Sequence, residues 1–170
     1  MFNTTIATQI YAKICFEATN SQKKIIENLS EYLSDDDFSR IFVLNGFAGT
    51  GKTTLIAAVV AALKELRIKP VLLAPTGRAA KVLARYCGEQ ALTIHKRIYR
   101  QRTNADYESK FSLDFNREQG AVFIVDEASM LSDSTGDGAL FGSGSLLEDL
   151  VSYVRSGRGC RLILVGDSAQ

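Results

Sequence analysis

The chain has 170 residues, of which 46 % are hydrophobic and 23 % are charged, and its formal net charge at pH 7 is +1. This length and composition suit one globular domain with a hydrophobic core, and no apolar run reaches the roughly 18 residues of a membrane-spanning helix. The three cysteines are scattered without a Cys-x-x-Cys pair, and there is one histidine, so a disulfide scaffold and a zinc site are both disfavoured. We expect a domain of the reducing cytoplasm, not of a membrane.

Two helices are predicted before the first strand. Apolar residues recur every four positions from Phe2 to Ile14, which is compatible with a short helix. The Thr-Asn-Ser sequence at 19–21 offers N-cap side chains, and a second helix is predicted over 22–33 with its apolar residues on one face. Three aspartates at 35–37 then form a solvated turn.

The stretch from Gly46 to Thr54, GFAGTGKTT, fits the pattern G-x-x-x-x-G-K-[ST]. It lies between a short apolar run at 41–44, which predicts a buried strand, and an Ala/Leu/Val-rich stretch at 52–66, which predicts a helix. In such a loop the glycines let backbone N–H groups approach a phosphate, and the helix N-terminus adds its partial positive charge. Lys52 would reach the β- and γ-phosphates, and the Thr53 hydroxyl would bind Mg²⁺.

The strand, the loop and the helix together predict a site for a nucleoside triphosphate. The residues that we expect to bind it from this loop are Gly46, Ala48, Gly49, Thr50, Gly51, Lys52, Thr53 and Thr54.

A second strand and helix follow the phosphate-binding loop. Residues 71–74 form a continuous apolar run, which is typical of a central parallel strand, and 75–77 form a turn. A helix is predicted over 78–86, with Val82 and Leu83 pointing into the core. Residues 93–99 are expected to form a short helix or a turn.

Basic residues are concentrated in this part of the chain. Residues 78–102 contain seven basic residues and one acidic residue, whereas 103–170 contain five basic and eleven acidic residues. Arg78, Lys81 and Arg85 have a spacing that places them on one helix face. The two segments could pair inside the fold, or the basic one could contact the backbone of a nucleic acid, and the charges favour neither alternative.

Two segments have no helical pattern. Residues 101–119 are polar, but alternating apolar residues from Phe111 to Phe115 predict a strand or a hairpin. Residues 132–145 are rich in Gly, Ser and Asp, which predicts a flexible loop.

Apolar runs at 121–125 and 161–165 predict two more strands, and the sequence at 146–155 predicts a helix between them.

Four apolar strands separated by helices predict an α/β fold with a mostly parallel sheet flanked by helices. Ligands of such sheets bind outside the carboxyl ends of the strands. Candidate groups follow all four strands, at 46–54, at 75–78, at Asp126-Glu127 and at 167–170. We therefore expect them to form one site.

Asp126 and Glu127 directly follow the third strand. Asp126 is placed to hold Mg²⁺ opposite Thr53, and Glu127 to orient and polarise the attacking water. The alternative is a pair of carboxylates that cap the next helix. A guanine-specific Asn-Lys-x-Asp segment is absent from the sequence, so a hydrolysing ATPase is favoured over a GTPase. Gln170 could sense the γ-phosphate or be polar surface, and His95 could be a local hydrogen-bonding residue.

Five segments, taken together and in this order, resemble the first RecA-like motor domain of superfamily 1 helicases, in the RecD-like branch that moves 5′→3′ on single-stranded DNA. They are FAGTGKTT at 47–54, APTGRAA at 74–80, TIH at 93–95, VDEASML at 125–131 and VGDSAQ at 165–170. The resemblance covers roughly 16–170, and its second and fourth segments are the most specific.

The resemblance implies a role for each matching residue. Gln22 would recognise adenine, the loop residues would hold ATP, Thr53 and Asp126 would hold Mg²⁺, and Glu127 would be the catalytic base. Gln170 would couple the γ-phosphate to motion, and Lys52 would act on the phosphates. The residues implied in binding single-stranded DNA are Pro75, Thr76, Arg78, Thr93 and His95.

In the family, the residue that matches Gln170 is followed by a second RecA-like domain, which supplies an arginine finger. The sequence, read as a single RecA-like domain over 1–170, is therefore expected to be a fragment of a longer helicase. An arginine finger contributes on the order of 10³–10⁵ in rate, so we expect the fragment to hydrolyse ATP poorly. Residues 101–119 match a strand-separating insert of the family, but the segment is short for a wedge.

The sequence thus predicts the ATP-binding motor domain of an ATP-dependent DNA helicase or translocase. Two alternatives stay open, namely a P-loop ATPase that remodels its target without translocation and a nucleotide-binding switch module. DNA and RNA are not distinguished by the sequence, and the direction of movement depends on the resemblance alone.

Overall fold

The computed structural model describes residues 2–46, 49, 51–103, 109–131 and 141–167. Its central element is a five-stranded sheet with the order β1-β7-β6-β2-β3, in which every neighbouring pair is parallel. The strands are β1 (Ile41–Gly46), β2 (Pro70–Ala74), β3 (Ala91–Thr93), β6 (Val122–Val125) and β7 (Arg161–Asp167). The predicted α/β fold is confirmed. β3 was not predicted, because three residues are too few to show a pattern.

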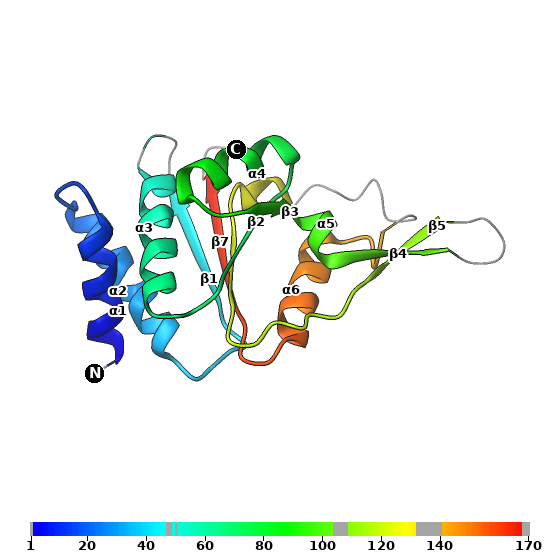
Figure 1. Cartoon of the computed structure of the whole chain (residues 1–170), viewed down its shortest axis with the longest axis horizontal. Coiled ribbons are helices and arrows are strands. Elements are labelled where there is room, and N and C mark those ends of the chain that lie inside the picture. Colours follow the sequence, from blue (N-terminus) through cyan, green and yellow to red (C-terminus); the bar gives the residue numbers. More distant parts are fainter. Residues whose placement is uncertain (1, 47–48, 50, 104–108, 132–140, 168–170) are drawn as a thin grey trace.

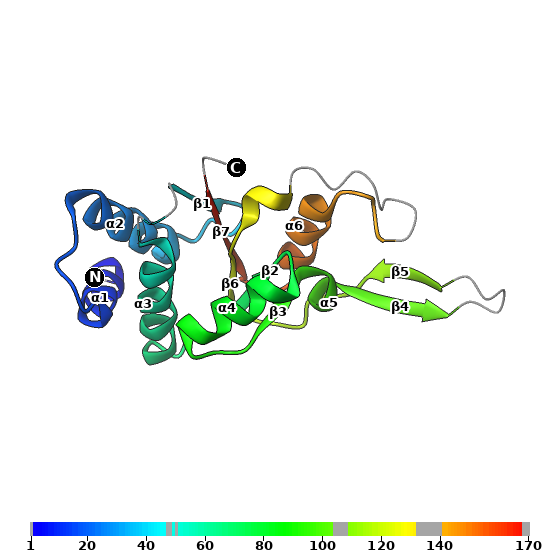
Figure 2. The same ribbon diagram turned by 90° about the horizontal axis from the view of Figure 1, so that it is seen from above.

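Helices cover both faces of the sheet (Figures 1 and 2). The helices are α1 (Phe2–Lys13), α2 (Asn20–Ser34), α3 (Lys52–Glu65), α4 (Gly77–Cys87), α5 (Ile94–Ile98) and α6 (Leu146–Ser156), with a 3₁₀ turn η1 (Ala128–Leu131). The first three pack on one face, and α5 and α6 on the other. Among the described residues, no helix combines the length and the apolar composition that a membrane span requires.

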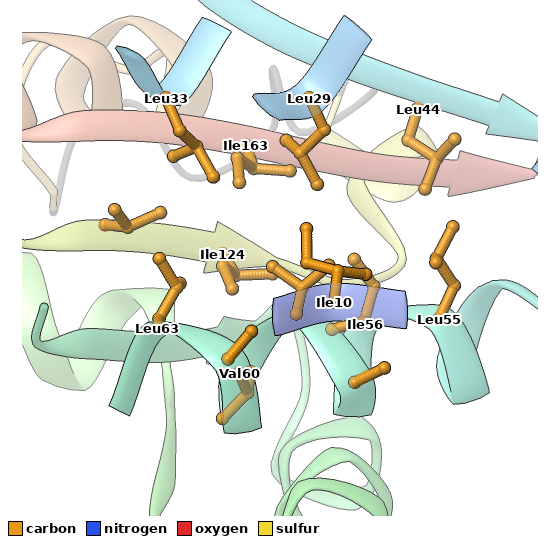
Figure 3. Close-up of a cluster of buried hydrophobic side chains, with 14 of the residues drawn as sticks. Ile10, Leu29, Leu33, Leu44, Leu55, Ile56, Val60, Leu63, Ile124 and Ile163 are labelled. Carbon is orange, nitrogen blue, oxygen red and sulfur yellow. The ribbon is translucent and has the colours of Figure 1, made fainter. Parts of the chain in front are cut away.

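Strand residues alternate between the two cores. Leu72, Ile124 and Ile163 belong to the core under α1, α2 and α3, which Figure 3 shows in close-up. Their neighbours Leu73 and Phe123 belong to the core under α5 and α6. Because both faces are covered, the central strands are apolar at successive positions, and this is why they appeared in the sequence as continuous runs.

Val82 does not point into the core as predicted. It is 45 % exposed, whereas its neighbour Leu83 is fully buried in the core with α1, α2 and α3, on the face of α4 that also buries Ala79 and Ala80. One residue turns an α-helix by about 100°, so burial of Leu83 places Val82 at the edge of the solvent face, beside Arg78.

A two-stranded antiparallel hairpin, β4 (Tyr99–Thr103) and β5 (Ser109–Leu113), extends beyond the main sheet (Figure 1). It confirms the strand-or-hairpin prediction for this segment. Phe141 stacks on Phe111 of β5, with ring centroids 4.6 Å apart, and the Gly142 N–H donates to the Phe111 carbonyl. Most of the loop predicted at 132–145 lies outside the described residues, and its flexibility stays a prediction.

Candidate nucleotide site at the carboxyl edge of the sheet

A cavity of about 380 Å³ lies at the carboxyl ends of β1, β6 and β7, beside the N-terminus of α3. Four segments line it: the phosphate-binding loop and α3, the turn after β6, the end of β7, and the last turn of α4. The described lining residues are Gly49, Gly51, Lys52, Thr53, Thr54, Tyr86, Asp126, Glu127, Ser129, Gly166 and Asp167.

The loop conformation requires glycine at two positions. Gly49 and Gly51 have φ values of +78° and +80°, in the left-handed region that side chains disfavour. Gly51 is also the N-cap of α3, and a glycine has no side chain with which to cap the first N–H groups of that helix. The first turn of α3 contains no acidic residue. The positive end of the helix dipole therefore faces the cavity without a neutralising group from that turn.

Lys52 is positioned by the loop that it follows. Its Nζ donates a hydrogen bond to the carbonyl oxygen of Gly46, 2.5 Å away, at the end of β1. This hydrogen bond directs the side chain toward the end of β1, and Lys52 lines the cavity beside the helix N-terminus.

Asp126 is a partly buried carboxylate at the end of β6. Burial raises its pKa, while the N–H of Glu127, which donates to Oδ1 at 3.0 Å, and the charge of Lys52 act in the opposite direction. The Asp126 N–H donates to the carbonyl of Leu73 in β2 at 3.0 Å, which fixes the backbone at this point. A desolvated carboxylate of this kind is stabilised by a nearby cation.

Glu127 has a strained backbone. Its φ is +55°, which is uncommon for a residue with a side chain, and its carbonyl accepts a hydrogen bond from the Met130 N–H in the η1 turn. Such conformations cost on the order of 1 kcal/mol or more and cluster at functional sites. The side chain of Glu127 is exposed in the cavity next to Asp126.

Gln22 comes from α2, far away in the sequence, and lies against the loop. Its Nε2 is 3.3 Å from the position that a Cβ on Gly51 would occupy. Its Oε1 accepts a hydrogen bond from the Thr19 N–H at 3.0 Å, in a capping box that fixes the side chain. The structure thus brings the predicted adenine-recognising residue next to the phosphate-binding loop.

The predicted DNA-binding residues gather at the same edge, over β2 and β3. Thr93 is the register partner of Ala74, so the starts of α4 and α5 lie side by side. The Thr76 hydroxyl accepts a hydrogen bond from the Ala79 N–H, and the Thr93 hydroxyl accepts one from the Lys96 N–H. Both threonines therefore cap helices, whatever else they bind.

Pro75 and Arg78 flank Thr76 at the start of α4, and Arg78 is exposed. His95 packs against Tyr99 and Phe141, with ring centroids 5.6 and 5.1 Å away. The half-buried histidine belongs to an aromatic cluster at the base of the hairpin.

The expectation that all strand ends form one site is wrong for residues 75–78. The residues at 75–78 were expected to share a single site with the phosphate-binding loop, but none of them is among the described residues that line the cavity. The sheet order explains this, because β2 and β3 lie beyond β6 from β1 and β7. The carboxyl edge therefore carries two neighbouring regions. Ala48, Thr50 and Gln170 lie outside the described residues, and their roles stay predictions.

Tyr86 and Ser129 line the cavity but were not singled out in the sequence. Tyr86 is 62 % exposed on the last turn of α4. Its sequence position, an aromatic residue next to the basic residues of that helix, could have indicated a functional role. Ser129 lies close to β7 because Gly166 has no side chain. A Cβ on Gly166 would lie 3.5 Å from the Ser129 N and 3.2 Å from Oδ1 of Asn45.

The basic residues at 78–102 were expected either to pair inside the fold or to contact a nucleic acid, and the structure divides them between these two alternatives. Arg97 pairs with Glu118 at 2.7 Å and Arg100 with Asp114 at 3.3 Å, which is internal pairing. Arg78, Lys81 and Arg85 are exposed, and the ion pairs within the described part of the chain do not include them. A basic face on α4 remains.

The donor set suits a nucleotide with Mg²⁺. The Thr53 hydroxyl and the Asp126 carboxylate line one cavity, and oxygen donors with water are what Mg²⁺ prefers. The unneutralised helix N-terminus and Lys52 suit phosphate oxygens. The partly buried, desolvated Asp126 favours a cation at this place.

Comparisons with known proteins agree with this geometry. A family model described as an AAA domain matches residues 17–170. The ATP-dependent RecD2 DNA helicase of Deinococcus radiodurans is 29 % identical over 150 residues, which are 88 % of this chain and 18 % of that protein. The RecBCD enzyme subunit RecD of Mycobacterium tuberculosis is 34 % identical over 154 residues, covering 76 % of this chain and 24 % of that subunit.

The ATP-dependent DNA helicase dda of phage T4 is 37 % identical over 92 residues, which cover 51 % of this chain and 20 % of that helicase. The chain therefore spans less than a quarter of the length of each of these relatives.

Proposed function

The chain belongs to the AAA-domain family, with RecD-like helicases among its relatives, and on that premise we propose that it is the ATP-binding motor domain of an ATP-dependent DNA helicase or translocase that acts on single-stranded DNA. The resemblance predicted from the sequence motifs is confirmed, and the chain is a helicase-type motor domain. ATP hydrolysis, Mg²⁺, the DNA strand, a second RecA-like domain and the cytoplasmic location belong to the proposal.

One observation carries the proposal: the phosphate-binding loop, Asp126 and Glu127 meet in one cavity beside the N-terminus of α3. The first N–H groups of α3 and the Lys52 ammonium would bind phosphate oxygens, and Thr53 and Asp126 would hold Mg²⁺. When bound, Mg²⁺ neutralises the charge that develops on the phosphates. Gln22, held by its capping box beside the loop, would read the base.

Glu127 would orient the attacking water and accept its proton. The residue is exposed in the cavity, and its backbone N–H donates to Asp126 Oδ1, so the two acidic residues lie next to each other. Asp126 beside it would hold Mg²⁺, so the two acids would have separate roles.

The solvent face of α4 supports the DNA part of the proposal. Arg78, Lys81 and Arg85 are exposed there, together with Tyr86. Basic residues bind phosphates, and exposed aromatic rings stack on the bases of single strands. α4 begins beside Thr93 and ends at the nucleotide cavity, so one helix borders both regions.

The decisive experiment measures ATP hydrolysis by the complete protein with and without single-stranded DNA, for wild type, Lys52→Ala and Lys64→Ala. Lys64 is an exposed lysine of the same helix, paired with Glu89, and serves as the control. We expect stimulation by DNA that Lys52→Ala abolishes and Lys64→Ala retains.

Hydrolysis that depends on Lys52 but not on DNA would indicate the remodelling ATPase, and nucleotide binding without turnover the switch module. For the 170-residue chain alone we expect poor hydrolysis, which the same assay tests. Robust DNA-stimulated turnover by the chain alone would contradict that part.

A further inference from the structure

A second cavity, of about 500 Å³, lies at the amino ends of β2, β6 and β7, the lower edge of the sheet in Figure 1. β7 connects the two edges, from Arg161 in this cavity to Asp167 in the nucleotide cavity. A strand of this length spans roughly 20 Å, so the second cavity is separate from the nucleotide site.

Arg161 is built into this cavity. It is 8 % exposed, its guanidinium carbon lies 4.5 Å from the ring centroid of Phe38 and 5.7 Å from that of Tyr32, and its Nη2 donates to the Asp35 carbonyl. Its other terminal nitrogen, Nη1, is buried and has no hydrogen-bond partner among the described residues. A buried charged donor without an acceptor is costly, and arginine cannot lose its proton to relieve this.

The charge around Arg161 is not compensated locally. The described lining residues include Arg158 as a second cation and no carboxylate. Two acids next to lining residues are paired elsewhere, since the Asp35 carboxylate pairs with Arg40 and Glu118 pairs with Lys69 and Arg97, and Asp36 and Asp37, which precede Phe38, are not among the lining residues. The cavity therefore attracts an anion.

The remaining walls are apolar. Leu33, Ile68 and Val122 line the cavity, and Phe38, which is 43 % exposed, presents part of its ring to solvent beside them. A small inorganic anion would leave these walls uncovered. A ligand that joins a carboxylate to an apolar side chain would satisfy both parts.

We propose that this cavity docks an acidic peptide segment of a partner protein, in which a carboxylate side chain adjoins an apolar one. The carboxylate faces Arg158 and Arg161, which both line the cavity, and the apolar side chain covers Leu33, Ile68 and Val122. Because Arg161 is already held by two rings and a carbonyl, its side chain loses little freedom on binding. Two copies of the chain related by a two-fold axis would bring like charges together at this cavity, which disfavours self-association there.

The experiment uses fluorescence anisotropy of a fluorescein-labelled peptide in which aspartate alternates with phenylalanine and leucine, compared with a peptide that has asparagine in place of each aspartate. The exposed Arg158 is changed to Glu, with Arg117→Glu as the control, since Arg117 is an exposed arginine outside the cavity. We expect the acidic peptide to bind, about tenfold weaker binding to Arg158→Glu, and wild-type binding to Arg117→Glu.

A second pair of variants tests the apolar part of the cavity. Phe38→Ala should weaken binding several-fold, whereas Phe115→Ala, at a ring that is also exposed, should not. In ¹H–¹⁵N spectra the acidic peptide should shift the amides of Gly120 and Gly159, which border the cavity.

Equal binding of the asparagine peptide, equal loss in both arginine variants, or amide shifts outside the cavity would each overturn the proposal. So would a concentration-dependent dimer in sedimentation that Arg158→Glu disrupts, because a second copy would then be the occupant. None of these outcomes depends on ATP hydrolysis, so this proposal and the proposed function fail separately.

Discussion

The two halves of the carboxyl edge differ in how their residues are held. Over β1, β6 and β7, groups converge on a cavity and tolerate local costs: a desolvated Asp126, a strained Glu127 and a helix N-terminus without a capping side chain. Over β2 and β3, the threonines cap their helices and the cations of α4 lie in solvent. Preorganised strain suits one small ligand of fixed shape, whereas a relaxed, exposed face suits a polymer bound through many weak interactions.

The largest effect that separates the two halves is expected at Glu127. Glu127→Gln should reduce ATP turnover of the complete protein by about 10²–10⁴, because the general base is lost, while nucleotide affinity changes little. Single-turnover hydrolysis and equilibrium nucleotide binding measure the two quantities. A parallel loss of affinity would mean that Glu127 binds the nucleotide instead of activating water.

The strain itself can be tested at the same residue. Glu127→Gly should raise the free energy of unfolding by up to about 1 kcal/mol, since glycine accepts a φ of +55° without a steric cost. Urea unfolding of the chain measures this, with Glu118→Gly, at a position with two ion pairs, as a control that should destabilise. A destabilised Glu127→Gly variant would contradict the strain argument.

On the β2–β3 half the expected effects are smaller and depend on salt. Arg85→Ala and Lys81→Ala should each weaken single-stranded DNA binding a few-fold and lower the slope of log K against log[salt] by roughly 0.7 for each phosphate that is no longer neutralised. Arg158→Ala, at the opposite edge of the sheet, should leave both unchanged. If the slope of log K against log[salt] is unchanged in the α4 variants, α4 does not contact the DNA.

Tyr86 is where the two halves meet. Tyr86→Ala should weaken nucleotide binding by about fivefold, because a ring that lines the cavity is removed. Tyr86→Phe should retain most of the affinity, and Tyr11→Ala, at an exposed ring of α1, should retain all of it. Isothermal titration with a non-hydrolysed ATP analogue makes the comparison.

The smallest effect is a local electrostatic one at Cys87, next to Tyr86. Burial, together with the charges of Asp126 and Glu89, raises the pKa of its thiol to about 11. The thiol is thus protonated at neutral pH, and its alkylation should accelerate as the pH rises toward 11. Asp126→Asn should lower this pKa and speed alkylation at pH 9, with exposed Cys15 as the internal reference in mass spectrometry. A Cys87 alkylation rate that does not change in Asp126→Asn would mean that the charge of Asp126 does not contribute to this pKa.

Local patterns were enough to predict the helices, the four long strands, the phosphate-binding loop and the Asp-Glu pair. Each of these depends on neighbours within a few positions: buried parallel strands are continuous apolar runs, and Gly49 and Gly51 follow from the left-handed turns that the loop needs. The nucleotide half of the site could be predicted for the same reason, since the ends of parallel strands meet at one edge.

Tertiary structure alone decided which distant residues meet. The sheet order separates 75–78 from the nucleotide cavity, the packing of α4 brings Tyr86 into it, and α2 places Gln22 against Gly51. At the other edge, Arg161 is the first residue of an apolar strand, and nothing in its sequence neighbourhood predicted a cavity there. Only the fold brings the rings of Phe38 and Tyr32 against its guanidinium group. Such interactions join residues far apart in the chain, and their free energy depends on the order and register of the strands, which periodicity within a single segment does not specify.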